Sequence, residues 1–135
     1  MHIRRLSVVL TVAAIVGALA GCSGGSGYTD LDREASPGDE WPSDLPGYSI
    51  DSVDEQTSRL VGEFEGSTLY MARSAEPYGG ICLLVYSDAS DWVVGCGPAG
   101  LRVSGSSQRT YAVLTDGAES DGLQAVSKNV YVLQR

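Results

Sequence analysis

The chain has 135 residues, 43% of them hydrophobic and 19% charged, and its formal net charge at pH 7 is −8. This length suits one domain with a leader or tail, and the hydrophobic fraction is too high for a wholly disordered chain. The acidity argues against nucleic-acid binding, which relies on phosphate neutralisation. The single histidine, His2, precedes an apolar leader that should be removed. We therefore expect no histidine-based catalysis, no metal site and no cofactor.

Residues 1–21 have the three parts of a secretory signal peptide. Arg4 and Arg5 supply a positive start, an apolar stretch follows, and small residues end it. The apolar stretch 6–20 has 15 residues, whereas a helix needs about 20 to cross a bilayer. A cleaved signal peptide is therefore favoured over a transmembrane anchor.

The junction Leu19-Ala20-Gly21-Cys22 resembles the lipobox of bacterial lipoproteins. The resemblance implies that Cys22 receives a diacylglyceryl group on its sulfur and becomes the first residue after cleavage. Several acyl chains, palmitate among them, would then hold the protein durably, whereas one chain anchors only marginally. The expected location is the outer face of the cell membrane, with the membrane itself as a partner through Cys22.

Residues 22–55 have the composition of an acidic, flexible tether. The stretch 23–27 is rich in Gly and Ser, and residues 23–55 hold nine acids and one base, Arg33. A basic partner could dock on this acidic run, but a solvated, extended spacer is the favoured interpretation. The folded domain is then expected over residues 56–135.

Alternating apolar and polar residues, broken by Gly, Ser and Asp, predict an all-β domain over residues 56–135. We expect a small antiparallel β-sandwich or a barrel-like meander. The first hairpin, residues 59–72, should turn at Glu65-Gly66, because Gly66 can adopt the positive φ of a tight turn. This register places Leu60 opposite Met71 and Gly62 opposite Leu69.

The second hairpin joins residues 81–86 to residues 92–96 through a polar loop. If the loop is symmetric about Ala89, Tyr86 faces Trp92. Both faces of this hairpin are apolar, which predicts central strands that are covered on both sides.

The same register places Cys82 opposite Cys96. Directly opposed residues have Cα atoms about 4.5–5.5 Å apart, a distance that a disulfide tolerates. In an exported protein whose Cys22 is lipidated, these two thiols are the pair that remains. We therefore expect a Cys82–Cys96 disulfide within the hairpin.

Further strands are expected in the last third of the chain, over residues 101–103, 110–114, 123–126 and 129–133. The domain resembles a group of uncharacterised exported proteins and lipoproteins of actinobacterial type. The matching segments are Ile81-Cys82-Leu83-Leu84, Trp92-Val93-Val94-Gly95-Cys96-Gly97 and Val126-Ser127-Lys128-Asn129-Val130-Tyr131-Val132. The resemblance implies no activity and no catalytic residue.

Aromatic residues offer a candidate binding surface for a sugar or a peptide, made of Tyr70, Tyr78 and Tyr111. Packing in the core is the favoured explanation of these side chains, as it is for the facing pair Tyr86 and Trp92.

Acidic loops offer two further alternatives, formed by Asp88 with Asp91, and by Asp116 with Glu119 and Asp121. Their oxygens could bind calcium, or two carboxylates could act as acid and base on a glycan. Neither loop has EF-hand spacing, and Asp-Gly pairs are ordinary in turns.

The sequence therefore predicts a lipid-anchored, extracytoplasmic, non-catalytic β domain, a binding or interaction module of the cell envelope. Its partner would be an envelope protein or a glycan rather than nucleic acid. The alternatives are a cell-wall glycan hydrolase that uses carboxylates such as Asp88 or Asp121, and an accessory structural subunit of an envelope complex.

Overall fold

The computed structural model describes residues 25–77 and 79–134. The predicted signal peptide, Cys22 and Tyr78 lie outside these residues. Three short helical turns come first: α1 (Thr29–Asp32), η1 (Pro37–Asp39) and η2 (Gly47–Ile50). The strands follow as β1 (Val53–Phe64), β2 (Ser67–Ser74), β3 (Ile81–Asp88), β4 (Asp91–Gly97), β5 (Arg102–Ser104), β6 (Thr110–Val113), β7 (Leu123–Ala125) and β8 (Val130–Leu133).

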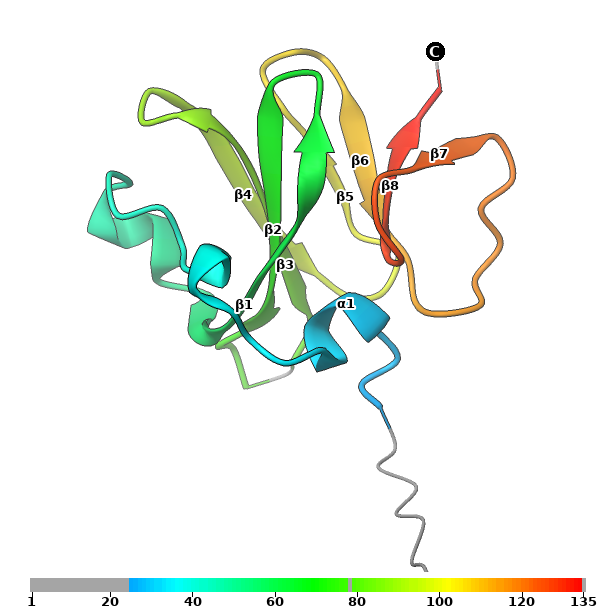
Figure 1. Ribbon diagram of the computed structural model, residues 1–135, viewed down its shortest axis with the longest axis horizontal. Helices are drawn as coiled ribbons and strands as arrows, with labels where there is room; N and C mark the ends of the chain where they lie inside the picture. Colours follow the sequence, from blue (N-terminus) through cyan, green and yellow to red (C-terminus); the bar gives the residue numbers. More distant parts are fainter. Residues whose placement is uncertain (1–24, 78, 135) are drawn as a thin grey trace, which may run out of the picture.

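The strands form two antiparallel four-stranded sheets, so the predicted all-β fold is confirmed (Figure 1). The first sheet is the meander β1-β2-β3-β4, and the second has the order β5-β6-β8-β7. Buried side chains of both sheets make one core cluster between them, as in a sandwich. The members from the strands are Leu69, Met71, Ile81, Leu83, Val85, Val103, Tyr111, Val113, Val130 and Val132.

The β1–β2 hairpin turns at Glu65 and Gly66, both with positive φ (47° and 83°), as predicted. Gly62 pairs with Leu69, also as predicted. Beyond Gly62 the register shifts by one residue, because β1 carries a bulge between Leu60 and Gly62. Leu60 therefore faces Tyr70, and the predicted pairing of Leu60 with Met71 is wrong.

The β3–β4 hairpin has the predicted register. Tyr86 pairs with Trp92 and Cys82 with Cys96, and the two cysteines form a disulfide with Cα atoms 4.0 Å apart. All five residues from Ile81 to Val85 are buried. The central strand β3 is therefore covered on both faces, as the sequence predicted.

The second cover is not another sheet but the N-terminal segment, defined here as residues 28–52. Leu31, which is 5% exposed, joins the core between the sheets. Trp41, with Leu45 and Ile50, packs on the outer face of the first sheet, over Leu84 and its neighbours (Figure 1, blue to cyan).

The prediction of a flexible tether over residues 22–55 is therefore wrong for the N-terminal segment, and the folded unit begins well before residue 56. Strand β1 itself starts at Val53. The segment is acidic overall, but it contains a few large apolar residues, and burying each of them stabilises the folded state.

Asp39 fixes the middle of the N-terminal segment, although the sequence predicts a solvated carboxylate there. The carboxylate is 4% exposed. It accepts hydrogen bonds from Arg33 Nη1 (2.8 Å), from the backbone amide of Ser36 (2.7 Å) and from the backbone amide of Leu60 in β1 (2.8 Å). This acid therefore joins the segment to the first sheet.

Asp30 fixes the start of the N-terminal segment to the second sheet. Its carboxylate accepts from the backbone amide of Asn129 (2.8 Å), and its own amide donates to Asn129 Oδ1 (2.9 Å). Asn129 is fully buried and also donates to Asp116 Oδ1 (2.9 Å). Residues nearly one hundred positions apart are thus held together at the end of the sandwich where α1 lies.

Candidate functional site

The structure does not bring the three predicted aromatic residues into one surface. Tyr111 is 0% exposed and packs edge-on against Phe64 between the sheets, with ring centroids 6.3 Å apart. Its assignment to a binding surface is therefore wrong. Tyr70 lies on the opposite face of the first sheet and packs against Trp41 (6.2 Å between centroids). Tyr78 is outside the described residues.

A different pair of aromatic rings lies at the surface. Tyr48 in η2 is 69% exposed, the one large hydrophobic side chain that is exposed among residues 25–77 and 79–134. Its ring contacts the half-buried ring of Trp92 at the start of β4, with centroids 5.9 Å apart and planes inclined by 42°. The pair presents apolar ring area to solvent, and tyrosine and tryptophan are enriched at recognition surfaces.

The pair forms one wall of a hollow that we call the aromatic pocket. Its volume is about 380 Å³, within the range of small-molecule sites. The lining residues are Tyr48, Ser49, Ser52, Trp92, Val94 and Cys96. The pocket therefore combines ring faces, two hydroxyl-bearing side chains and the exposed end of the disulfide.

Two parts of the fold position this pocket. The β3–β4 register sets Trp92 beside Tyr86, and the disulfide fixes the same strand pair at Cys96. The N-terminal segment supplies the other side, since η2 carries Tyr48 and ends just before Ser52. The second contribution depends on the packing of that segment onto the first sheet.

Carboxylates lie beside the aromatic pocket. The hydroxyl of Tyr86 donates to Asp44 Oδ2 (2.7 Å), and this hydrogen bond to a carboxylate raises the pKa of Tyr86 above its usual range. Ser52, which lines the pocket, donates to Glu76 Oε1 (3.4 Å). The surroundings are rich in acceptors and carry negative charge.

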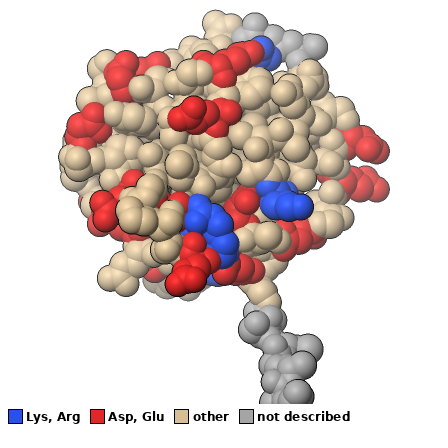
Figure 2. Space-filling model, in the orientation of Figure 1, with Lys and Arg blue, Asp and Glu red and all other residues tan. Residues whose placement is uncertain are grey.

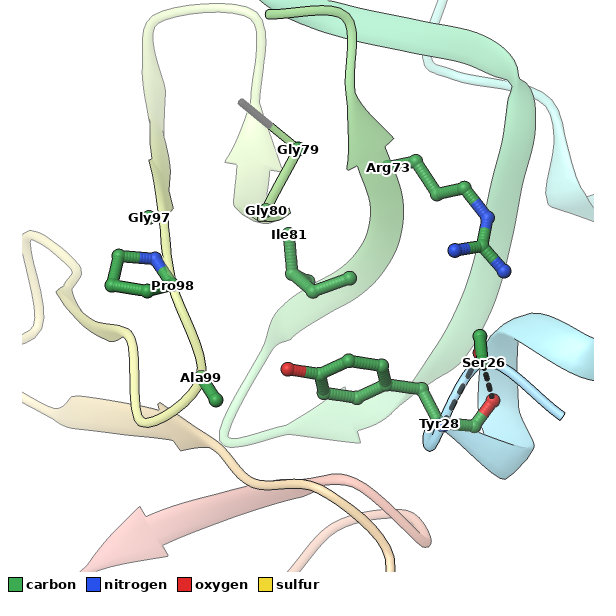
Figure 3. A pocket seen from close by; sticks show the side chains of 9 residues that line it. All are labelled: Ser26, Tyr28, Arg73, Gly79, Gly80, Ile81, Gly97, Pro98 and Ala99. Carbon is green, nitrogen blue, oxygen red and sulfur yellow. Dashed lines mark hydrogen bonds between the residues drawn. The ribbon is translucent and has the colours of Figure 1, made fainter. Parts of the chain in front are cut away.

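A second hollow, the N-terminal pocket, has a volume of about 480 Å³ and lies where the described chain begins (Figure 3). It is lined by Ser26, Tyr28, Arg73, Gly79, Gly80, Ile81, Gly97, Pro98 and Ala99. Its charged side chain, Arg73, has Nη2 only 3.6 Å from Asp32 Oδ1. Three of the lining residues are glycines, and the positive charge of Arg73 is already paired. The N-terminal pocket therefore offers fewer side chains for recognition than the aromatic pocket.

In each of the two acidic loops, one carboxylate is engaged in hydrogen bonds of the turn or loop. Asp88 Oδ1 accepts from the hydroxyl of Ser90 (2.6 Å) and the amide of Asp91 (3.0 Å), and these bonds, led by that of the Ser90 hydroxyl, lower the pKa of Asp88. Asp116 accepts from Asn129, which lowers its pKa in the same way. Among the residues described, no three His, Cys, Asp or Glu side chains are grouped so that they could hold a metal ion.

Tyr48 was missed because the sequence placed it in the predicted tether. The signal that could have found it is the sequence Pro46-Gly47-Tyr48, a turn that displays an aromatic residue, within a segment whose other large apolar residues are spaced for packing. The sequence predicts that Trp92 faces Tyr86, and this pairing gives no sign that Trp92 also lines a pocket.

Within the described part of the chain, no helix has the length and apolar character needed to span a membrane. Comparison with known proteins finds no matching family model, no matching curated protein and no matching solved structure. The function must therefore be inferred from the residues and their geometry.

Proposed function

We propose that this protein is a lipid-anchored, non-catalytic β module that binds a component of the cell envelope through the aromatic pocket. Its location would be the outer face of the cell membrane, with Cys22 as the lipidated residue. The observation that carries the binding role is the contact between exposed Tyr48 and Trp92 at the wall of that pocket.

Two features support export. The positive start, the apolar stretch and the lipobox-like junction at Cys22 occur in the right order for a lipoprotein signal. The Cys82–Cys96 disulfide supports the same location, because such bonds persist in oxidising compartments and are rare in the cytosol.

Binding rather than catalysis is supported by the use that the fold makes of its polar groups. Of the two carboxylates proposed for acid–base chemistry, Asp88 accepts hydrogen bonds within its turn, whereas Asp121 is exposed in another turn. The mature chain is proposed to lack histidine, since His2 precedes the cleavage site. The aromatic pocket, with acceptors around it, suits recognition.

Fractionation of cells tests the anchor. The full chain should be found with membranes, and Cys22→Ser should release it or leave the leader uncleaved. Ala20→Gly, which keeps a small residue before the cysteine, is the matched control. Full-length polypeptide with its leader intact in the cytosol would overturn the proposal.

Binding to isolated envelope fragments tests the module. The mature chain carrying Cys22→Ser should be retained by envelope from its own host, and Tyr48→Ala should reduce retention by at least about tenfold, as expected for an aromatic anchor. Retention that does not change in this variant would contradict the assigned pocket. Release of soluble fragments from the envelope, abolished by Asp88→Asn or Asp121→Asn, would overturn the non-catalytic assignment.

A further inference from the structure

We propose that the ligand of the aromatic pocket is an uncharged saccharide, held by a sugar ring that lies on Tyr48 and Trp92. This inference rests on the proposed function and adds the chemical class of the ligand. Three observations carry it: the charge of the segments that make the pocket, the arrangement of its two rings, and the polar groups beside them.

Charge argues against an anionic ligand. The pocket is built from residues 48–52 and 92–96, and the sequence has no Lys or Arg between residues 34 and 58 or between residues 74 and 101. The same stretches hold many acids, and acidic side chains outnumber basic ones on the face drawn in Figure 2. Neither Lys nor Arg is among the residues that line the pocket, so a phosphate- or carboxylate-bearing ligand would meet nearby acids without a cation in the lining to offset them.

Ring geometry suits a ligand that stacks on the surface of the pair. An ammonium group binds over a ring face within about 6 Å of its centroid, and an aromatic cage places several rings around it. Tyr48 and Trp92 contact each other, with centroids 5.9 Å apart and planes inclined by 42°, so they do not enclose a cation between them. Their adjoining ring faces, called here the ledge, can pack against the apolar face of a sugar ring, and tetramethylammonium is the competing ligand in the titration below.

Polar groups at the edge of the ledge suit hydroxyl groups. Ser49 and Ser52 line the pocket, and the carboxylates of Asp44 and Glu76 are hydrogen-bonded to Tyr86 and to Ser52. A hydroxyl both donates and accepts, so it can bond to serine hydroxyls and carboxylates alike. A purely apolar ligand would leave these groups without new partners and would gain less.

The indole signals of the two tryptophans provide the test. A ¹⁵N-labelled mature chain carrying Cys22→Ser is titrated with three uncharged tetrasaccharides, built of N-acetylglucosamine, glucose and mannose, and with tetramethylammonium and inorganic phosphate. We expect at least one saccharide to shift the Trp92 indole signal saturably, while the signal of buried Trp41 serves as the internal control. Tyr48→Ala should weaken that binding at least about tenfold, whereas Tyr48→Phe, which keeps the ring, should preserve it within about twofold.

Three results would overturn the inference: no saccharide moves the Trp92 signal, tetramethylammonium or phosphate moves it instead, or the saccharide response survives Tyr48→Ala unchanged. Retention on envelope fragments distinguishes a wrong ligand class from a wrong binding site. If retention depends on Tyr48 but no saccharide binds, the ligand class is wrong and the proposed module stands. If retention is also independent of Tyr48, both are wrong.

Discussion

Asp39 and Arg33 form a partly buried ion pair that ties the N-terminal segment to β1, because the same carboxylate also accepts the backbone amide of Leu60. The Arg33 guanidinium holds the pKa of Asp39 well below its usual range. This carboxylate is therefore ionised in the folded protein even in moderately acidic solution.

Acid should loosen the fold through this group. Because the pKa of Asp39 is lower in the folded than in the unfolded chain, its stabilising contribution is complete above the unfolded value of about 3.9 and is lost as the pH falls below it. Asp39→Asn should lower the free energy of unfolding at pH 7 by about 2–3 kcal/mol, and its stability should then change less between pH 5 and pH 2. Urea unfolding at several pH values measures both effects.

Asp121→Asn is the matched control for Asp39→Asn, since Asp121 is an exposed acid in a turn. It should change the free energy of unfolding by less than about 0.5 kcal/mol. Equal pH dependence in Asp39→Asn and the parent chain would contradict the role assigned to this ion pair.

Packing of the N-terminal segment predicts a cost for shortening its buried side chains. Leu31→Ala should lower the free energy of unfolding by about 2–5 kcal/mol, because Leu31 lies in the core between the sheets. Glu34→Ala, at an exposed position in the same segment, should have little effect. Unfolding followed by circular dichroism measures the difference. An unchanged free energy of unfolding in Leu31→Ala would instead support a flexible tether.

The disulfide should contribute strongly to a domain of this size. Closing a loop with a sequence separation of 14 stabilises the folded state by about 3 kcal/mol in the chain-entropy model. A reductant should therefore lower the denaturation midpoint of the parent chain, and the double variant Cys82→Ala with Cys96→Ala should match the reduced protein. A reductant that also lowers the midpoint of the double variant would show that it acts elsewhere.

Gly95 in β4 faces the second sheet, where a Cβ would lie 2.7 Å from Val103 Cγ2. Gly95→Ala should therefore cost about 1–3 kcal/mol through overpacking. In a Val103→Ala background the same change should cost much less, since the clashing methyl is gone. Gly38→Ala is the control, because a Cβ there meets nothing within 4 Å. If Gly95→Ala lowered the free energy of unfolding equally in the parent chain and in the Val103→Ala variant, this contact would be contradicted.

The hairpins were predictable because their signals are local. In β3–β4, alternation and a symmetric polar loop define one register, and the pairing of Cys82 with Cys96 follows from it. In β1–β2 the turn at Gly66 defines the register only as far as the bulge after Leu60. A bulge is set by what the strand packs against, which the alternation of the strand does not contain.

The N-terminal segment was not predictable from composition, because an average over acids and prolines conceals a few widely spaced apolar residues. Leu31 and Trp41 are buried only because two completed sheets offer surfaces to them. The acids Asp30 and Asp39 are used as hydrogen-bond acceptors for distant backbone amides, which local sequence cannot reveal. The aromatic pocket was missed for the same reason, since η2 supplies half of it.

With Cys22 as the proposed lipid anchor, the folded N-terminal segment would also limit how far the module can stand from the bilayer. Tyr28, the first buried side chain among the described residues, is six positions after Cys22, so a fully extended linker would reach at most about 21 Å. A 34-residue random coil would let the anchored domain sample a wide volume, whereas so short a linker would keep it close to the lipid headgroups. The proposed saccharide would therefore have to be one whose chain passes near the membrane surface, not one confined to the outer wall.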